Sequence, residues 1–293
     1  MNKIAIVMNK FAIVFLLILI PVHVFGWEQT MTCGVEFACK EGQVPLPTSW
    51  KSPCIGFHLN ENGTVAMPYT NVESIVKKSI NAWIQPDSSS LYPYFSGKTN
   101  EDRVGFNPYI SENANIIVFR DNGTWEESHA IMALTTVMHR NSTGEIYDAD
   151  IEINSSDYQY GIYEIDGEDV VDLQNVLTHE MGHVFGLSHS TNLSATMFPY
   201  SSTGEIALRD LSKDDIEAIS TIYPMDAASG ACHVDAYYFE KPPYEMNERP
   251  SGSSCSTNLH QSGSPMPVCI FMFLSICGMV VRRAYRKRGA ARM

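Results

Sequence analysis

The chain has 293 residues, 44% of them hydrophobic and 18% charged, and its formal net charge at pH 7 is −13. Residues 27–254 hold all 33 acidic residues and 12 of the 20 basic ones, which gives this part a net charge of −21. So acidic a domain favours solubility and cationic peptide partners, and it excludes nucleic acid as the expected substrate.

The N-terminus has the pattern of a targeting segment. Lys3 and Lys10 precede an apolar run from Phe11 to Ile20, and Val24-Phe25-Gly26 is an acceptable cleavage site before Trp27. We therefore expect residues 1–26 to be a signal peptide. The protein would be exported and would be secreted or displayed at the cell surface, with its main domain outside the cytoplasmic membrane.

Cysteines mark the segment that follows, residues 27–54. Outside the cell, cysteines at this density usually form disulfides. Four cysteines can form two disulfides in three alternative connectivities, and all three remain open: Cys33, Cys39, Cys54 and Cys232.

Residues 55–225 read as one domain that begins with alternating strands and helices. Cys54 to Asn60 is expected to be a first strand, and Asn71 could cap a helix that continues up to the break at Pro86. Further strands are expected at residues 115–119, 133–139 and 145–154, the last two joined by a turn-rich connection.

The strand at 145–154 has an acidic side. Asp148, Asp150 and Glu152 alternate with apolar residues, so one face should pack and the other should carry carboxylates. These carboxylates are suitable ligands for Ca²⁺, but a solvated acidic strand face is the alternative that we weigh more heavily.

The segment from His179 to His189 is the most informative in the chain. His179 and His183 lie one helical turn apart, so both imidazoles can reach one Zn²⁺ ion, while Glu180 is offset beside them as a candidate general base. Gly186 can adopt the left-handed conformation that ends the helix and returns the chain, which would deliver His189 as the third ligand. Three protein ligands leave one coordination position open, as in catalytic rather than structural zinc sites.

Two elements complete the domain. Residues 195–200, Ala-Thr-Met-Phe-Pro-Tyr, form a loop whose methionine, Met197, lies eight residues beyond the third histidine. Ser212-Lys213-Asp214-Asp215 then starts a final helix that ends before Pro224.

At these residues the chain resembles the metzincin metalloproteases, and more narrowly the matrixins, which carry H-E-x-x-H-x-x-G-x-x-H followed by a methionine turn. Ser190, directly after the third histidine, is what matrixins carry. By the same resemblance, Met197 would lie under the metal, and Pro199 and Tyr200 would form a wall of the main specificity pocket.

The resemblance implies an α+β metzincin (zincin) fold. A twisted, mostly parallel five-stranded sheet would have an antiparallel edge strand, accompanied by the zinc-binding helix, the methionine turn and the C-terminal helix. The edge strand around Leu134 and Thr135 would bind an extended peptide substrate.

The expected function is that of a zinc-dependent metalloendopeptidase that hydrolyses peptide bonds of extracellular proteins. Glu180 would take a proton from the attacking water and pass it to the leaving amine, and no covalent intermediate would form. We expect one catalytic zinc, a protein or peptide substrate and a monomer. A catalytically silent binding protein with the same fold is the rival class.

Some features of the vertebrate enzymes are not expected here. His129 and His139 do not have the spacing of the second, structural zinc site, so no structural zinc is expected. The stretch after Tyr223 is too short for a hemopexin-like propeller, and the expected shape is closer to that of compact bacterial matrixins. Cys33-Gly34-Val35 invites comparison with the cysteine switch that keeps matrixin proenzymes latent, but pairing of Cys33 in a disulfide is the favoured alternative.

The C-terminal part consists of a Ser/Gly-containing linker at residues 226–264 and a membrane or sorting segment at residues 265–293. The segment has a short apolar run from Met266 to Val281 followed by a basic tail, whose charge would keep the tail cytoplasmic. It resembles C-terminal sorting signals of the myxobacterial type, with Cys255 as the processing point. A permanent single-pass membrane anchor is the equal alternative.

Overall fold

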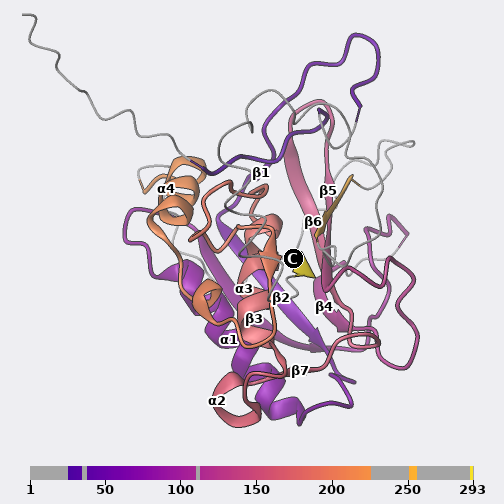
Figure 1. Ribbon diagram of the computed structural model, residues 1–293. Coiled ribbons are helices and arrows are strands. Elements are labelled where there is room, and N and C mark those ends of the chain that lie inside the picture. The colour runs from indigo at the N-terminus through magenta and orange to yellow at the C-terminus, as the bar shows by residue number, and fades with distance from the viewer. Residues whose placement is uncertain (1–25, 35–37, 110–112, 226–250, 256–290, 293) are drawn as a thin grey trace, which may run out of the picture.

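The computed structural model describes residues 26–34, 38–109, 113–225, 251–255 and 291–292 (Figure 1). The expected signal peptide apart from Gly26, most of the expected linker, Cys232 and the apolar run at 266–281 lie outside these residues. Within the described ranges, no helix combines the length and the apolar character needed to cross a membrane.

A sheet of seven strands forms the centre of the fold. Neighbouring strands follow the order β10-β5-β6-β4-β2-β3, and β1 pairs with β6. The pairs β5/β6 and β10/β5 are antiparallel, and the other pairs are parallel. The strands are β1 (Ser49–Trp50), β2 (Cys54–Asn60), β3 (Tyr92–Thr99), β4 (Asn115–Phe119), β5 (Ala133–His139), β6 (Glu145–Ile153) and β10 (Ser251–Cys255).

The predicted α+β architecture is confirmed, with two more strands than the five expected. The added strands are the short β1 and β10, and the second of these lies within the stretch expected to be linker. The prediction also missed β3, whose sequence contains Pro93 and Gly97. Proline cannot donate to a sheet ladder, which is tolerated here because β3 is the last strand at its end of the sheet.

Two long helices pack against each other, α1 (Tyr69–Ile84) and α3 (Leu173–Val184). The apolar positions of α1 recur at helical spacing, and Val72, Val76 and Trp83 are fully buried in the common core. The N-cap residue of α1 is Pro68 rather than Asn71, so the cap prediction was wrong by one turn. The apolar pattern fixes the buried face of a helix more firmly than it fixes the first residue.

The final helix, α4 (Lys213–Ile222), begins where the sequence predicts. Ser212 and Asp215 form a capping box, in which each side chain accepts from the backbone N–H of the other residue. The remaining elements are short: α2 (Tyr163–Asp166), β7 (Tyr160–Gly161), β8 (Val171–Asp172), β9 (Tyr200–Ser201), the 3₁₀ turn η1 (Ala207–Arg209) and β11 (Ala291–Arg292).

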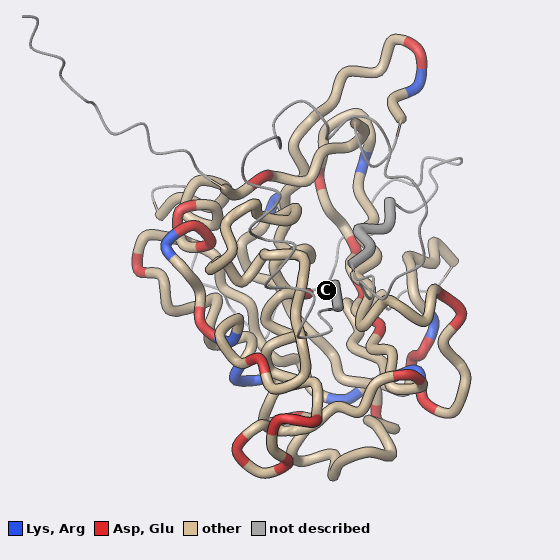
Figure 2. Tube along the Cα trace, viewed as in Figure 1, with Lys and Arg blue, Asp and Glu red and all other residues tan. Residues whose placement is uncertain are grey.

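The acidic side of β6 differs from the expected solvated face. Acidic positions are spread along the surface of the fold (Figure 2), but Asp148 and Asp150 are buried, with exposed fractions of 3% and 2%. Asp150 accepts hydrogen bonds from the backbone N–H groups of Gly105 and Ile116. The loop before β4 therefore covers this face, which the alternation of residues in β6 could not reveal. The calcium alternative stays a prediction.

The C-terminal end adds one short pairing. β11 pairs antiparallel with β9, so Ala291 and Arg292 lie beside Ser201 and Tyr200. The expected membrane or sorting segment at residues 265–293 lies almost wholly outside the described residues and stays a prediction.

Candidate metal and catalytic centre

Helix α3 carries the first part of the site, and its start is fixed by a side chain. Asp172 is the N-cap residue and accepts from the backbone N–H of Asn175 at 2.9 Å. The helix is buried on nearly every side, so His179, Glu180 and His183 are held rigidly by the core.

The helix ends so that the chain can turn back. Gly186 has φ 90°, the left-handed region that favours glycine, and a Cβ atom at this position would collide with the carbonyl oxygen of Thr48. The turn then brings His189 to the two helical histidines, as the spacing predicts.

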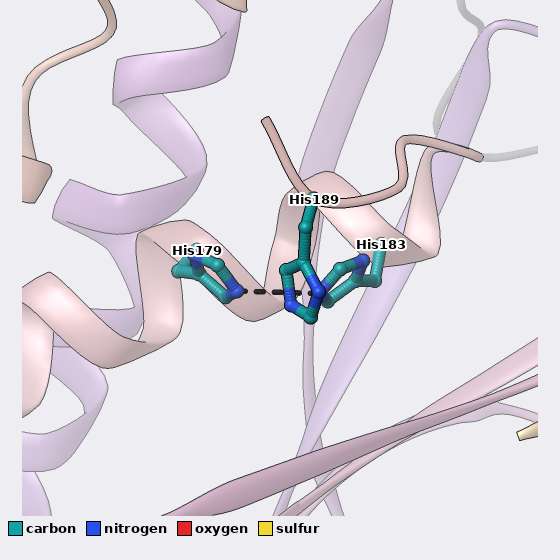
Figure 3. Close-up of side chains that lie close together, drawn as sticks. All are labelled: His179, His183 and His189. Atoms are coloured by element: carbon teal, nitrogen blue, oxygen red, sulfur yellow. Dashed lines mark hydrogen bonds between the residues drawn. The ribbon is translucent and has the colours of Figure 1, made fainter. Parts of the chain in front are cut away.

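The three imidazoles face one another from these two elements (Figure 3). Their candidate ligand atoms all lie within 4.8 Å of one another, and the Nε2 atoms of His179 and His183 are 3.2 Å apart. His179 and His183 are buried and His189 is half-buried.

Backbone carbonyls orient the two helical imidazoles. His179 Nδ1 lies 2.6 Å from the carbonyl oxygen of Thr196, and His183 Nδ1 lies 2.7 Å from that of Leu187. A carbonyl can only accept, so each Nδ1 carries the proton and each Nε2 presents its lone pair toward the shared space. With the His189 imidazole beside them, these two neutral imidazoles fit a tetrahedral Zn²⁺ ion with one open position.

Glu180 is fully buried beside these histidines. Its Oε2 atom accepts a hydrogen bond of 2.6 Å from the Thr135 hydroxyl on β5, and among the described residues its Oε1 atom has no hydrogen-bond partner. Burial raises the pKa of Glu180 to about 8, and the hydrogen bond from Thr135 opposes this rise. The arrangement gives a carboxylate that is fixed in position and retains one oxygen for a reacting group.

Met197 packs directly under α3. It is 1% exposed, and a Cβ atom on Gly182 would collide with its sulfur. Packing therefore requires a glycine at position 182, between the two helical histidines, because the methionine loop approaches the helix closely there. Pro199 and Tyr200 follow this loop half-buried, and Tyr200 begins β9.

Two carboxylates of α4 support the site, and sequence reasoning treated them only as the start of a helix. Asp214 Oδ2 accepts from the Ser190 hydroxyl at 2.6 Å, next to His189. Asp215 accepts from the backbone N–H groups of Thr196 and Met197 at 2.8 and 3.1 Å. An acidic pair at a helix start was visible in the sequence, but nothing there indicated which loop would reach it.

The C-terminal end of α3 is held by side chains from distant parts of the chain. Trp50 Nε1 donates to the carbonyl oxygen of Val184 at 2.7 Å, and the Tyr223 hydroxyl donates to that of Phe185 at 3.0 Å. Farther back, Trp83 Nε1 donates to the carbonyl oxygen of Thr178 at 2.9 Å. The contacts from Trp50 and Tyr223 satisfy carbonyls that a helix end leaves without partners, and the contact from Trp83 holds the middle of the helix.

The segment before β1 runs beside the loop that carries His189. Thr30 donates from its backbone N–H to the Gly186 carbonyl, and Ser188 donates to the Glu28 carbonyl. Cys33 and Cys39 form a disulfide, and Cys54 is also disulfide-bonded. Cys33 in this bond has no thiolate to offer a metal, which disfavours the cysteine-switch alternative.

The structure therefore brings together six of the residues singled out from the sequence: His179, Glu180, His183, His189, Thr135 and Met197. Leu134 lies next to Thr135 on β5 and is 8% exposed. Cys255 is the last residue of β10, far along the chain from the site but paired with Ala133 of β5. Cys232 falls outside the described residues.

Comparison with known proteins agrees with this geometry. The family model for matrixins matches residues 49–224. The chain is 27% identical over 197 residues to the interstitial collagenase of Equus caballus, covering 65% of this chain and 36% of that protein. It thus spans about a third of the length of this collagenase.

Two further relatives differ in the extent of the match. Human matrilysin is 24% identical over 197 residues, which cover 67% of this chain and 66% of matrilysin. Metalloendoproteinase 5-MMP of Arabidopsis thaliana is 50% identical over a shorter stretch of 54 residues, or 18% of this chain and 15% of that protein.

Proposed function

The chain belongs to the matrixin family, whose members are zinc-dependent metalloendopeptidases, and from this premise we propose that it hydrolyses internal peptide bonds of extracellular proteins. The observation that carries the proposal is the joint placement of three imidazoles, two of them oriented by backbone carbonyls, and one buried carboxylate on α3 and the loop after it.

His179, His183 and His189 would hold the zinc, which when bound polarises the scissile carbonyl and the attacking water. Glu180 would take the proton from that water and deliver it to the leaving nitrogen. Its Oε1 atom has no hydrogen-bond partner among the described residues, while Thr135 holds the Oε2 atom, so one oxygen is available for both transfers.

The walls of the site favour an extended peptide. β5, which bears Leu134 and Thr135, would form main-chain hydrogen bonds with an added peptide strand on the side where β10 now pairs. The rings of Phe198 and Tyr200 lie 5.6 Å apart, which supports an apolar specificity pocket beyond Met197.

We also propose that the protein is exported. The N-terminal pattern supports a signal peptide at residues 1–26, and the disulfide between Cys33 and Cys39 fits an oxidising compartment. With this pair formed, Cys54 would pair with Cys232. The likeness to compact bacterial matrixins and the C-terminal sorting signal or membrane anchor remain parts of the proposal that rest on sequence alone.

The experiment that tests the function measures zinc content and casein cleavage for the full chain, for Glu180→Ala and for a chelator-treated sample. We expect one zinc per chain in the wild type and in Glu180→Ala, with cleavage only by the untreated wild type. Zinc binding without any cleavage would favour the silent binding protein, and absence of zinc would refute the assignment.

A further inference from the structure

The edge of the sheet that a substrate would need is already paired with the protein's own chain. β10 lies antiparallel along β5, and Figure 1 shows its gold arrow beside that strand. The register pairs Ser251 with Val137 and Cys255 with Ala133, so the five residues of β10 cover most of β5.

The register is centred on Thr135, the residue whose side chain holds the proposed catalytic base. Ser253, the middle residue of β10, is paired with Thr135, and the Thr135 hydroxyl holds the Glu180 carboxylate. Two residues of β10 lie on each side of this point. A peptide that adds to β5 for cleavage must use the same stretch of backbone, so β10 and a substrate exclude each other.

A second pairing involves β9, the strand that follows the methionine loop. β9 is tied to α3 by a hydrogen bond of 3.0 Å from Asn175 Nδ2 to the Ser201 hydroxyl, and β11 pairs with Tyr200 and Ser201 of this strand. The C-terminal region of the chain therefore pairs with two strands, β5 and β9, that both contact the helix bearing the first two histidines.

We propose that the segment Ser251–Cys255 is an intramolecular blocking strand that keeps the protease latent by occupying β5. This inference rests on the proposed function for its catalytic consequence. The sequence Ser-Gly-Ser-Ser-Cys has no large side chain to fill a specificity pocket, so main-chain hydrogen bonds hold it in place. Such pairing is weak between separate molecules, but within one chain the effective concentration of the segment is high.

The blocking strand acts by competition. A peptide substrate must displace it, which raises the apparent KM, and once it is displaced the catalytic groups are unchanged, so kcat stays the same. Release or removal of the segment activates the enzyme without any change at Glu180 or the histidines.

The test compares two double variants of the full chain. Gly252→Pro with Ser253→Pro removes two consecutive backbone N–H groups. In an antiparallel pair these groups alternate between facing the partner and facing away, so one of the two must face β5. Gly252→Ala with Ser253→Ala is the matched control, because it changes the same side chains and keeps both N–H groups.

Two readouts are taken from each protein. One is kcat and KM on a quenched fluorescent peptide over a hundredfold range of enzyme concentration, and the other is hydrogen exchange of the β5 amides. We expect the proline variant to lower KM at least fivefold with kcat unchanged and to speed exchange in β5. The alanine variant should match the wild type, and the rate per enzyme should not depend on enzyme concentration.

Each other outcome has a definite meaning. Unchanged KM and unchanged exchange in the proline variant would overturn the proposal, as would a wild-type rate per enzyme that rises on dilution, because that shows blocking between chains. If exchange in β5 speeds up but no form cleaves peptide, the occupied edge is upheld and the proposed protease function has failed.

Discussion

The Thr135 hydroxyl on β5 donates a 2.6 Å hydrogen bond to the Glu180 carboxylate on α3. One residue of the proposed substrate-binding strand thus also holds the proposed catalytic base. In the proposed mechanism, substrate binding and proton transfer would be coupled through this single side chain.

Thr135→Val is therefore expected to lower kcat/KM by about tenfold to a hundredfold, the range for loss of a hydrogen bond to a charged group. Zinc content should be unchanged, since the Thr135 hydroxyl forms its hydrogen bonds with Glu180, which is not one of the proposed zinc ligands. Thr135→Ser retains the hydroxyl and should keep most of the activity. Steady-state kinetics and zinc analysis of the wild type and both variants make the comparison. An equal loss of kcat/KM in Thr135→Val and Thr135→Ser would exclude the positioning role.

Gly182→Ala should destabilise the fold. The added methyl group would collide with the Met197 sulfur inside a packed core, where overpacking costs about 1–3 kcal/mol. Urea unfolding of the variant measures the cost. Adding Met197→Ala creates the missing space, so the double variant should lose less stability than the two single losses summed; simple additivity would show that the two residues do not press on each other.

Asp215→Asn should loosen the methionine loop. An amide can replace only part of the accepting capacity of the carboxylate, which takes backbone N–H groups from Thr196, Met197 and Ser212. We expect a loss of about 2–4 kcal/mol in unfolding free energy, with weaker zinc binding, because the Thr196 carbonyl orients His179. Asp210→Asn, at an exposed position, is the matched control and should alter neither quantity.

The buried carboxyl groups of β6 predict the pH dependence of stability. Burial raises the pKa of Asp150 to about 7, and burial together with the neighbouring Asp150 raises the pKa of Asp148 well above its usual value, while Arg103 partly opposes both shifts. A raised pKa means that the folded state holds the proton more tightly than the unfolded chain. This contribution to stability is therefore present near pH 4 and is lost as the pH rises through about 7.

Asp148→Asn removes one of these groups, whose Oδ2 atom is buried without a hydrogen-bond partner among the described residues. We expect the variant to gain about 1–2 kcal/mol at pH 8 and little at pH 4, measured by urea unfolding with EGTA present. Repeating the measurement with added Ca²⁺ tests the calcium alternative. A wild type that gains stability with Ca²⁺, and a variant that does not, would support an ion at Asp148.

How far the sequence predicts the site depends on how local each signal is. The His179-to-His189 spacing, the Gly186 turn and the Ser212 cap are fixed by residues within one or two turns of one another, and the structure places them as expected. The hydrogen bonds that Asp214 and Asp215 accept join residues that are remote in sequence. No periodic pattern in the sequence predicts these contacts.

The same limit explains the other differences. β3 was missed because Pro93 and Gly97 weaken the strand pattern, although pairing with β2 provides its stability. The alternation of apolar and acidic residues in β6 indicates only that the two faces of the strand differ, so it predicts a solvated face for Asp148 and Asp150, which are in fact buried. Which side is covered depends on a loop that folds over the sheet. The pairing of Ser251–Cys255 with β5 is likewise a contact that the Ser/Gly composition of this segment does not predict.

The anchoring of α3 has a consequence for local opening of the helix. Trp50, Trp83 and Tyr223 reach the helix from three separate parts of the chain, and all donate to main-chain carbonyls around the histidines. The helix cannot fray without breaking contacts that also hold the core together. Hydrogen exchange of the α3 amides is thus tied to global unfolding, and these amides should be among the last in the chain to exchange.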